Sequence, residues 1–231
     1  MRKFIVLLAF VGLIVATAIP ILLRREQLVF QGSDFYGMTV VLDPGHGGKD
    51  GGASSKSGLV EKDIALAVTQ KVESHLRLHG FNVVLSRDGD YDLASPGAVK
   101  RKREDLNNRA RLFNAHPDGI GISIHLNATT NERWKGAQTF YQPGLIENKQ
   151  LATAIMERMN HNLDGSSREA KAINDILILK HSQIPTALVE IGFLSNPEEA
   201  ELLGTEAYQR EVAYAIYEGI ISFLSSPPAA E

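Results

Sequence analysis

The sequence contains no cysteine in its 231 residues. Disulfides, thiolate nucleophiles and cysteine-ligated zinc sites are therefore excluded, and histidine and carboxylate side chains remain as the strong metal ligands. The chain also lacks a basic excess, since its formal net charge is −3, so we expect no nucleic-acid partner. Its 44% hydrophobic content suffices for one core, and the length is too short for two ordinary domains with linkers.

One long apolar run is present, from Phe4 to Leu23. It is about 20 residues long, enough for a helix to cross ~30 Å of hydrocarbon. We interpret residues 1–25 as a membrane anchor. A cleaved signal is the alternative, because Ala16–Ala18 offers small residues for cleavage; a buried core helix is disfavoured, because the run has no polar face. Both leading interpretations place the rest of the chain outside the cytoplasm.

The rest of the sequence predicts one folded domain. Residues 26–37 indicate a tether, 38–226 the domain, and 227–231 a disordered tail. Short apolar runs alternate with amphipathic stretches, which predicts an α/β fold: a single domain with a mostly parallel open sheet flanked by helices on both faces, preceded by an N-terminal apolar helix. The expected strands are Thr39–Asp43, Asn82–Ser86, Ile120–His125, Ala137–Tyr141 and Thr186–Ile191, with a further apolar run at Ile176–Leu179; the expected helices are Glu61–His79, Leu106–Ala115, Glu147–Leu163 and Glu206–Ser225.

Four residues with chemically useful side chains fall at equivalent points of this fold. His46 follows the first strand, His125 ends the third, and Glu190 lies near the end of the last. Glu61 begins the first helix of the domain, in line with its inward-facing stripe. Because open parallel sheets bind ligands beyond the carboxyl ends of their strands, we expect the four side chains to meet there.

Two histidines and one glutamate can hold a catalytic zinc ion and leave an open position for water. A nearby free carboxylate can then take the proton of that water and pass it to the leaving nitrogen. Glu190 suits this role, because the apolar residues at 187–189 before it favour proton uptake. We therefore predict one zinc ion on His46, Glu61 and His125, and a metal-dependent amide hydrolase.

Other candidates receive simpler interpretations. His75 and His79 are four residues apart on a helix and could hold a metal, but they fit better as partly exposed helix-end residues, His79 being favourable at the negative end of the helix dipole. Lys100–Arg103 indicates a solvated loop face, with contact to an acidic polymer as the weaker interpretation. Trp134 either stacks on a sugar ring or anchors a loop by packing.

Four segments carry a family resemblance: Asp43–Gly48, Glu61–Asp63, Ser123–Ala128 and Val189–Asn196. Together they resemble the zinc-dependent N-acetylmuramoyl-L-alanine amidases of the amidase-3 type, over about Thr39 to Leu224. The resemblance implies cleavage of the amide between the lactyl group of N-acetylmuramic acid and the L-alanine of the peptidoglycan stem.

Residue by residue, the resemblance assigns the zinc to His46, Glu61 and His125 and catalysis to Glu190. It also places Asn127 and Arg109 at recurrent family positions, as substrate contacts.

Within the family, the chain looks most like the germination-specific branch of spore-forming bacteria. The likeness rests on the anchor before the catalytic domain, on Leu93–Gly97 followed by Arg101–Leu106, and on Trp134–Gln138. It implies removal of stem peptides from spore-cortex peptidoglycan between the forespore membranes, in partnership with a polysaccharide deacetylase that allows muramic-δ-lactam to form.

Control of such an enzyme is expected from outside the catalytic site. The stretch Asn127–Ala137 leaves no room for the autoinhibitory helix of some division amidases. Expression, localisation or a protein activator would then regulate activity.

Two alternatives stay open at this point. A catalytically silent peptidoglycan-binding or scaffold protein would keep the same fold, although it has no need for an unpaired glutamate beside a metal. A zinc peptidase acting on other peptides would share the metal chemistry and differ in the shape of its pocket.

Overall fold

The computed structural model describes residues 35–163 and 167–226. The expected anchor at 1–25, most of the tether at 26–37 and the tail at 227–231 lie outside these residues. Within them, no helix combines the length and the apolar character needed to cross a membrane.

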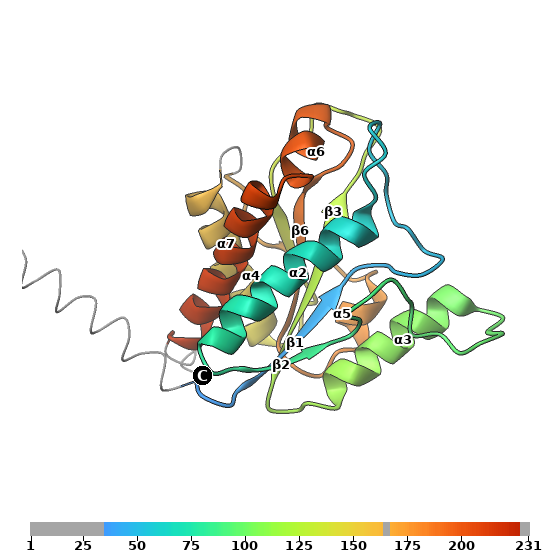
Figure 1. The fold of residues 1–231 in the computed structure, drawn as a ribbon. Helices are drawn as coiled ribbons and strands as arrows, with labels where there is room; N and C mark the ends of the chain where they lie inside the picture. Colours follow the sequence, from blue (N-terminus) through green and yellow to red (C-terminus); the bar gives the residue numbers. More distant parts are fainter. Residues whose placement is uncertain (1–34, 164–166, 227–231) are drawn as a thin grey trace, which may run out of the picture. The chain divides into compact units, whose positions relative to one another are not determined.

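The described residues form one six-stranded sheet in the order β2-β1-β3-β6-β4-β5 (Figure 1). The strands are β1 (Thr39–Pro44), β2 (Asn82–Leu85), β3 (Ile120–Asn127), β4 (Gln138–Tyr141), β5 (Lys171–Ala172) and β6 (Thr186–Phe193). Strands β2, β1, β3 and β6 are parallel to one another, whereas β4 pairs antiparallel with β6. The predicted single α/β domain with a mostly parallel sheet is confirmed.

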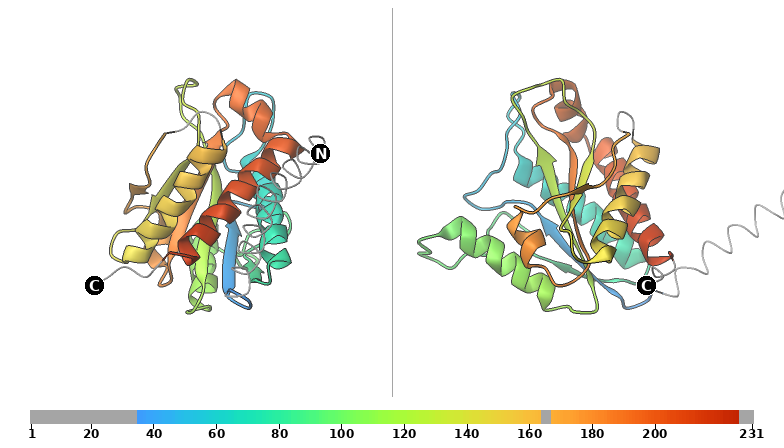
Figure 2. Two further views of the ribbon diagram at one scale, coloured as in Figure 1. Left: turned by 90° about the vertical axis from the view of Figure 1, so that its left-hand side faces the viewer. Right: turned by 180° about the vertical axis from the view of Figure 1, so that it is seen from behind.

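Helices cover both faces of the sheet (Figures 1 and 2). On one face, α7 (Glu206–Leu224) packs against both α2 (Glu61–Leu78) and α4 (Ile146–Asn162). On the other face, α3 (Arg101–Asn114) and α5 (Leu177–His181) close a buried apolar cluster over Val41 and Leu188 of the sheet. The short helix α6 (Pro197–Leu203) follows β6 at the carboxyl end of the strands.

Several local expectations need correction. The apolar run at Ile176–Leu179 becomes α5, because a short apolar run fits a buried helix as well as a strand, and the helix buries Ile178 and Leu179. Strand β5 and helix α6 were not expected. Helix α6 does have a local signal, since Asn196 caps it and proline occupies its first turn.

The basic run at Lys100–Arg103 is not a loop face. Helix α3 begins at Arg101, five residues before the expected start at Leu106. Basic residues at a helix amino terminus oppose the helix dipole, so the sequence pattern did not predict that the helix begins at this turn. Arg101 compensates by donating two hydrogen bonds, 2.8 and 2.7 Å long, to the Asp92 carboxylate.

Candidate metal centre and active site

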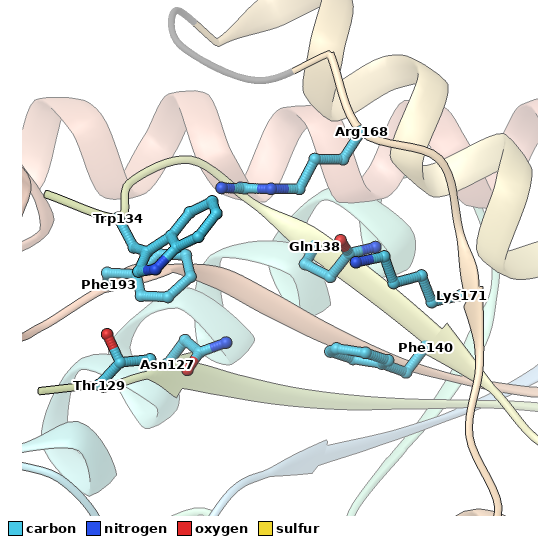
Figure 3. Close-up of a pocket in the computed structure, with 8 residues that line it drawn as sticks. All are labelled: Asn127, Thr129, Trp134, Gln138, Phe140, Arg168, Lys171 and Phe193. Atoms are coloured by element: carbon cyan, nitrogen blue, oxygen red, sulfur yellow. The ribbon is translucent and has the colours of Figure 1, made fainter. Parts of the chain in front are cut away.

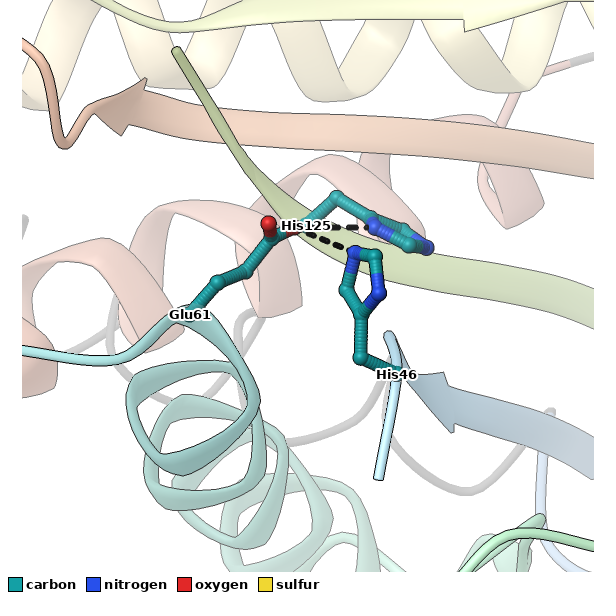
Figure 4. Close-up of side chains that lie close together, drawn as sticks. All are labelled: His46, Glu61 and His125. Carbon is teal, nitrogen blue, oxygen red and sulfur yellow. Dashed lines mark hydrogen bonds and ion pairs between the residues drawn. The ribbon is translucent and has the colours of Figure 1, made fainter. Parts of the chain in front are cut away.

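The structure brings the three predicted metal ligands together at the carboxyl end of the sheet (Figure 4). Glu61 Oε1 lies 3.1 Å from His46 Nε2 and 3.1 Å from His125 Nδ1. The candidate ligand atoms of the three residues all lie within 4.8 Å of one another. Two imidazole nitrogens and one carboxylate oxygen form a donor set that suits zinc.

The loop after β1 places the His46 side chain. Gly45 donates its N–H to the Ile124 carbonyl at 2.8 Å, which ties the loop to β3. His46 then adopts a left-handed backbone conformation with φ of 59°, a strained state that persists where the surroundings require it. A Cβ atom at position 45 would overlap the His125 ring, so glycine allows the loop and the ring to approach.

The first residue of α2, Glu61, is held by the backbone around it. Its side chain accepts the N–H of Leu126 at 3.0 Å on Oε1 and the N–H of Ala53 at 2.8 Å on Oε2. Burial alone would raise the pKa of Glu61, but the hydrogen bonds and charges of His125 and His46 hold it below its ordinary range. The carboxylate is therefore ionised, as a metal ligand must be.

The Asp50 carboxylate lies next to the Nδ1 atom of the His46 ring. Its Oδ2 lies 3.1 Å from His46 Nδ1, on the side of the ring opposite Glu61, and 3.1 Å from Lys102 Nζ of α3. Burial acts to raise the pKa of Asp50, but His46 and Lys102 lower it to about 2. The contact has ion-pair distance without hydrogen-bond geometry, so Asp50 acts on the Nδ1 side of the ring through its charge and leaves Nε2 as the candidate ligand atom. The sequence interpretation missed Asp50, whose only signal is an acid four residues after the histidine.

The side chain of Glu190 lies beside this cluster. Its Cα pairs in register with His125 of β3 and with Gln138 of β4, so all three side chains project from the same face of the sheet. Its Oε2 is buried and has no hydrogen-bond partner among the described residues. Burial, with a smaller contribution from the charge of Glu61, raises the pKa of Glu190 to about 7 against the opposing charge of His125. A buried oxygen without a partner fits a base that receives a proton from water.

Arg109 is buried beneath the loop that carries His46. It is 1% exposed, and its guanidinium donates to the Asp43 carboxylate at 2.7 Å, to the Pro44 carbonyl at 2.8 Å and to Asp105 and the His46 carbonyl. The substrate contact that the resemblance suggested stays a prediction. In the structure Arg109 positions the loop that carries His46.

A second buried arginine, Arg87, was missed by the sequence interpretation. It donates to the Pro44, Gly45 and Lys62 carbonyls at 3.1, 2.7 and 2.8 Å. Arg87, just after β2, and Arg109, on α3, therefore both hold the loop that carries His46. An arginine directly after a predicted strand carries no pattern that distinguishes it from a surface residue.

The remaining candidates have defined positions. Asn127 ends β3, two residues after His125, and lines a pocket with Trp134 (Figure 3). Trp134 is 53% exposed, and its ring centroid lies 5.9 Å from the Arg168 guanidinium carbon. The imidazoles of His75 and His79 pack on the aromatic ring of Tyr217 at 5.5 and 5.0 Å, at the end of α2.

Comparison with known proteins agrees with this geometry. The profile of the N-acetylmuramoyl-L-alanine amidase family matches residues 40–222. The chain is 43% identical over 192 residues to the germination-specific N-acetylmuramoyl-L-alanine amidase of Bacillus subtilis, covering 82% of this chain and 81% of that one. It is 29% identical over 228 residues to the amidase AmiA of Escherichia coli, covering 80% and 75%.

A solved structure supports the same assignment. The CwlD amidase of Clostridioides difficile, in complex with the GerS lipoprotein, matches with a TM-score of 0.79 at 39% identity, covering 82% of this chain and 99% of that one. These relatives are amide hydrolases. The chain described above is therefore an enzyme that belongs to the N-acetylmuramoyl-L-alanine amidase family.

Proposed function

We propose that this enzyme holds one zinc ion between His46, Glu61 and His125 and hydrolyses the amide between N-acetylmuramic acid and L-alanine in peptidoglycan. Glu190 is the general base. One observation carries the proposal: the buried, unpartnered carboxyl oxygen of Glu190 lies beside three converging ligand-type side chains.

The chain's own residues prepare the site. A bound zinc ion would supply polarisation of the scissile carbonyl and a lower pKa, near ~7, for an attacking water. Glu61 is oriented by two backbone N–H groups, and the charge of Asp50 lies on the Nδ1 side of the His46 ring while Nε2 faces Glu61. Glu190 accepts a proton from the attacking water and donates it to the alanine nitrogen as the C–N bond breaks. A pKa near 7 suits both transfers, because the group can gain and lose a proton at neutral pH.

The relatives support a finer assignment to the spore. One carries the name of a germination-specific amidase, which supports a role of this chain in germination. Action on spore-cortex peptidoglycan, and formation of muramic-δ-lactam together with a polysaccharide deacetylase, are the finer parts of the proposal and come from the family resemblance. The lipoprotein in the CwlD complex supports a protein partner for this chain, to which we assign the role of activator. The apolar segment at 4–23 supports anchoring in a membrane, with the catalytic domain between the forespore membranes.

The proposal is tested by digesting purified cortex and vegetative peptidoglycan, with and without a chelator, followed by mass spectrometry. We expect intact stem peptides with a free L-alanine amine, loss of product with the chelator, and recovery on adding zinc. The Glu190→Gln variant is the matched control and should yield no peptide.

The other outcomes select among the alternatives. Cleavage within the stem would indicate a zinc peptidase. Binding to the wall without any product would indicate a silent wall-binding protein. Product formation that the chelator does not reduce would overturn the zinc assignment, and equal activity on both walls would overturn the cortex assignment.

A further inference from the structure

A pocket with a volume of about 210 Å³, shown in Figure 3, has no role in the proposed mechanism. Its walls include the aromatic rings of Trp134, Phe140 and Phe193. Asn127 joins it to the metal centre, because Asn127 follows His125 by two residues on β3 and so projects from the same face. The pocket is thus a continuation of the catalytic site.

Strand register gives the position of the pocket relative to the catalytic base. Gln138, which lines the pocket, pairs with Glu190, and Phe140 pairs with Lys171 of β5. Paired residues project from the same face, so the pocket lies on the Glu190 face over β4 and β5. Adjacent strands are ~4.8 Å apart, which puts the β5 backbone ~10 Å to the side of the β6 backbone.

The pocket is positively charged. Lys171 and Arg168 line it, and no carboxylate does among the described residues. Arg168 directs its guanidinium to the carbonyls of Lys135, Gly136 and Ala137, so it holds the loop and adds its charge. Lys171 is exposed and makes no ion pair with a described residue, so its ammonium can meet an incoming anion.

The opposite flank of the site has a different charge. There the acids Asp50, Asp90 and Asp92 lie around the metal-binding loop, paired with Lys102, Lys62 and Arg101. On the β4–β5 side the charge of Arg168 faces the buried carboxylate of Glu199, whereas Lys171 has no ion pair with a described residue. Lys171 therefore carries the available positive charge of this flank. An anionic part of the substrate is drawn to that side.

We propose that this pocket is the stem-peptide subsite and that Lys171 binds a free carboxylate of the peptide. The inference rests on the proposed function. Of the two parts joined by the scissile amide, the N-acetylated sugars are neutral, whereas the stem peptide carries carboxylates. Extended chain spans ~3.3–3.6 Å per residue, so the second and third stem residues lie ~7–10 Å from the scissile nitrogen, within reach of the Lys171 side chain.

Two carboxylates have this chemistry, and substrate analogues distinguish them. The first is the α-carboxylate of the γ-linked D-glutamate at position two, and the second belongs to diaminopimelate at position three. The test measures kcat/KM for N-acetylmuramoyl peptides that carry glutamate or isoglutamine at position two, each with diaminopimelate or lysine at position three. Wild-type enzyme and Lys171→Ala are compared on all four.

We expect wild-type enzyme to prefer the carboxylate over its neutral counterpart at one position by about tenfold, the size of a charge-assisted contact at a partly exposed site. In Lys171→Ala this ratio should fall to near one, and in Lys171→Arg it should be kept. Lys149→Ala, which removes an exposed lysine on α4 over the other sheet face, should leave the ratio unchanged. A ratio that Lys171→Ala does not alter at either position would overturn the proposal.

A binding measurement separates failure of the subsite from failure of the proposed function. The probe is the free tripeptide L-alanyl-γ-D-glutamyl-diaminopimelate. It is titrated calorimetrically into the inactive Glu190→Gln protein and into the double variant Glu190→Gln with Lys171→Ala. Binding that weakens about tenfold on loss of Lys171 supports the subsite even if no amide is cleaved. Binding equal in both proteins rejects it, whatever the activity.

Discussion

Replacing Glu190 by glutamine removes the ionisable group from the site and keeps its size. In the native protein, burial raises the pKa of Glu190 from 4.5 to about 7. The native state therefore holds a proton up to about pH 7, whereas the unfolded chain releases it near pH 4.5, so wild-type stability falls as the pH rises through this window. Glutamine stays neutral throughout and does not show this loss.

The pKa difference sets the size of the effect. A rise from 4.5 to about 7 corresponds to at most about 3 kcal/mol, and partial solvent access to the side chain reduces it to about 1–3 kcal/mol. Metal-free Glu190→Gln should therefore be more stable than metal-free wild type by this amount at pH 8, and equally stable at pH 4.5. Turnover should fall by about 10²–10⁴-fold, the usual contribution of general acid–base catalysis.

The assay is denaturant unfolding of both proteins with a chelator present, at several pH values from 4.5 to 8, because bound metal would add its own stabilisation. Zinc content and stem-peptide release are then measured on the metal-loaded proteins. A Glu190→Gln protein that is no more stable than wild type at pH 8 would refute the electrostatic account. One that retains near-normal turnover would refute the general-base role.

Three further changes separate metal binding from structure. His125→Ala should lose both zinc and turnover, whereas Glu190→Gln keeps its zinc; equal zinc loss in metal analysis of the two would contradict this division of roles. Asp50→Ala should weaken zinc affinity by about 10–100-fold, the usual effect of removing a group that contacts a metal ligand. Competition with a fluorescent chelator measures this affinity, and an unchanged value would reject the positioning role of Asp50. Arg109→Ala should lower the free energy of unfolding by about 3–5 kcal/mol, because it leaves Asp43 buried without its partner. The exposed pair of Arg210 is the control: Arg210→Ala should cost less than about 1 kcal/mol, and similar costs in the two variants would show that burial of the pair is unimportant.

The sequence by itself determined the architecture and the three metal-ligand candidates. Alternation of apolar runs with amphipathic stretches predicted the parallel strands β1, β2, β3 and β6, because strand and helix periods depend on local spacing alone. The same spacing placed His46, Glu61 and His125 at one edge, where the structure brings them together. The sequence also indicated that Glu190 favours proton uptake, because its neighbours on the strand are apolar, and the pKa of Glu190 is raised in the structure.

Only the tertiary structure decided what surrounds these residues. Asp50 behind His46, Arg87 and Arg109 under the metal-binding loop, and Lys171 beside the pocket are contacts between segments far apart in the chain or between side chains with no periodic pattern. A charged residue in a loop looks the same in sequence whether it is solvated or buried against a partner. Its environment depends on how separate strands and loops pack, and that is a property of the folded chain.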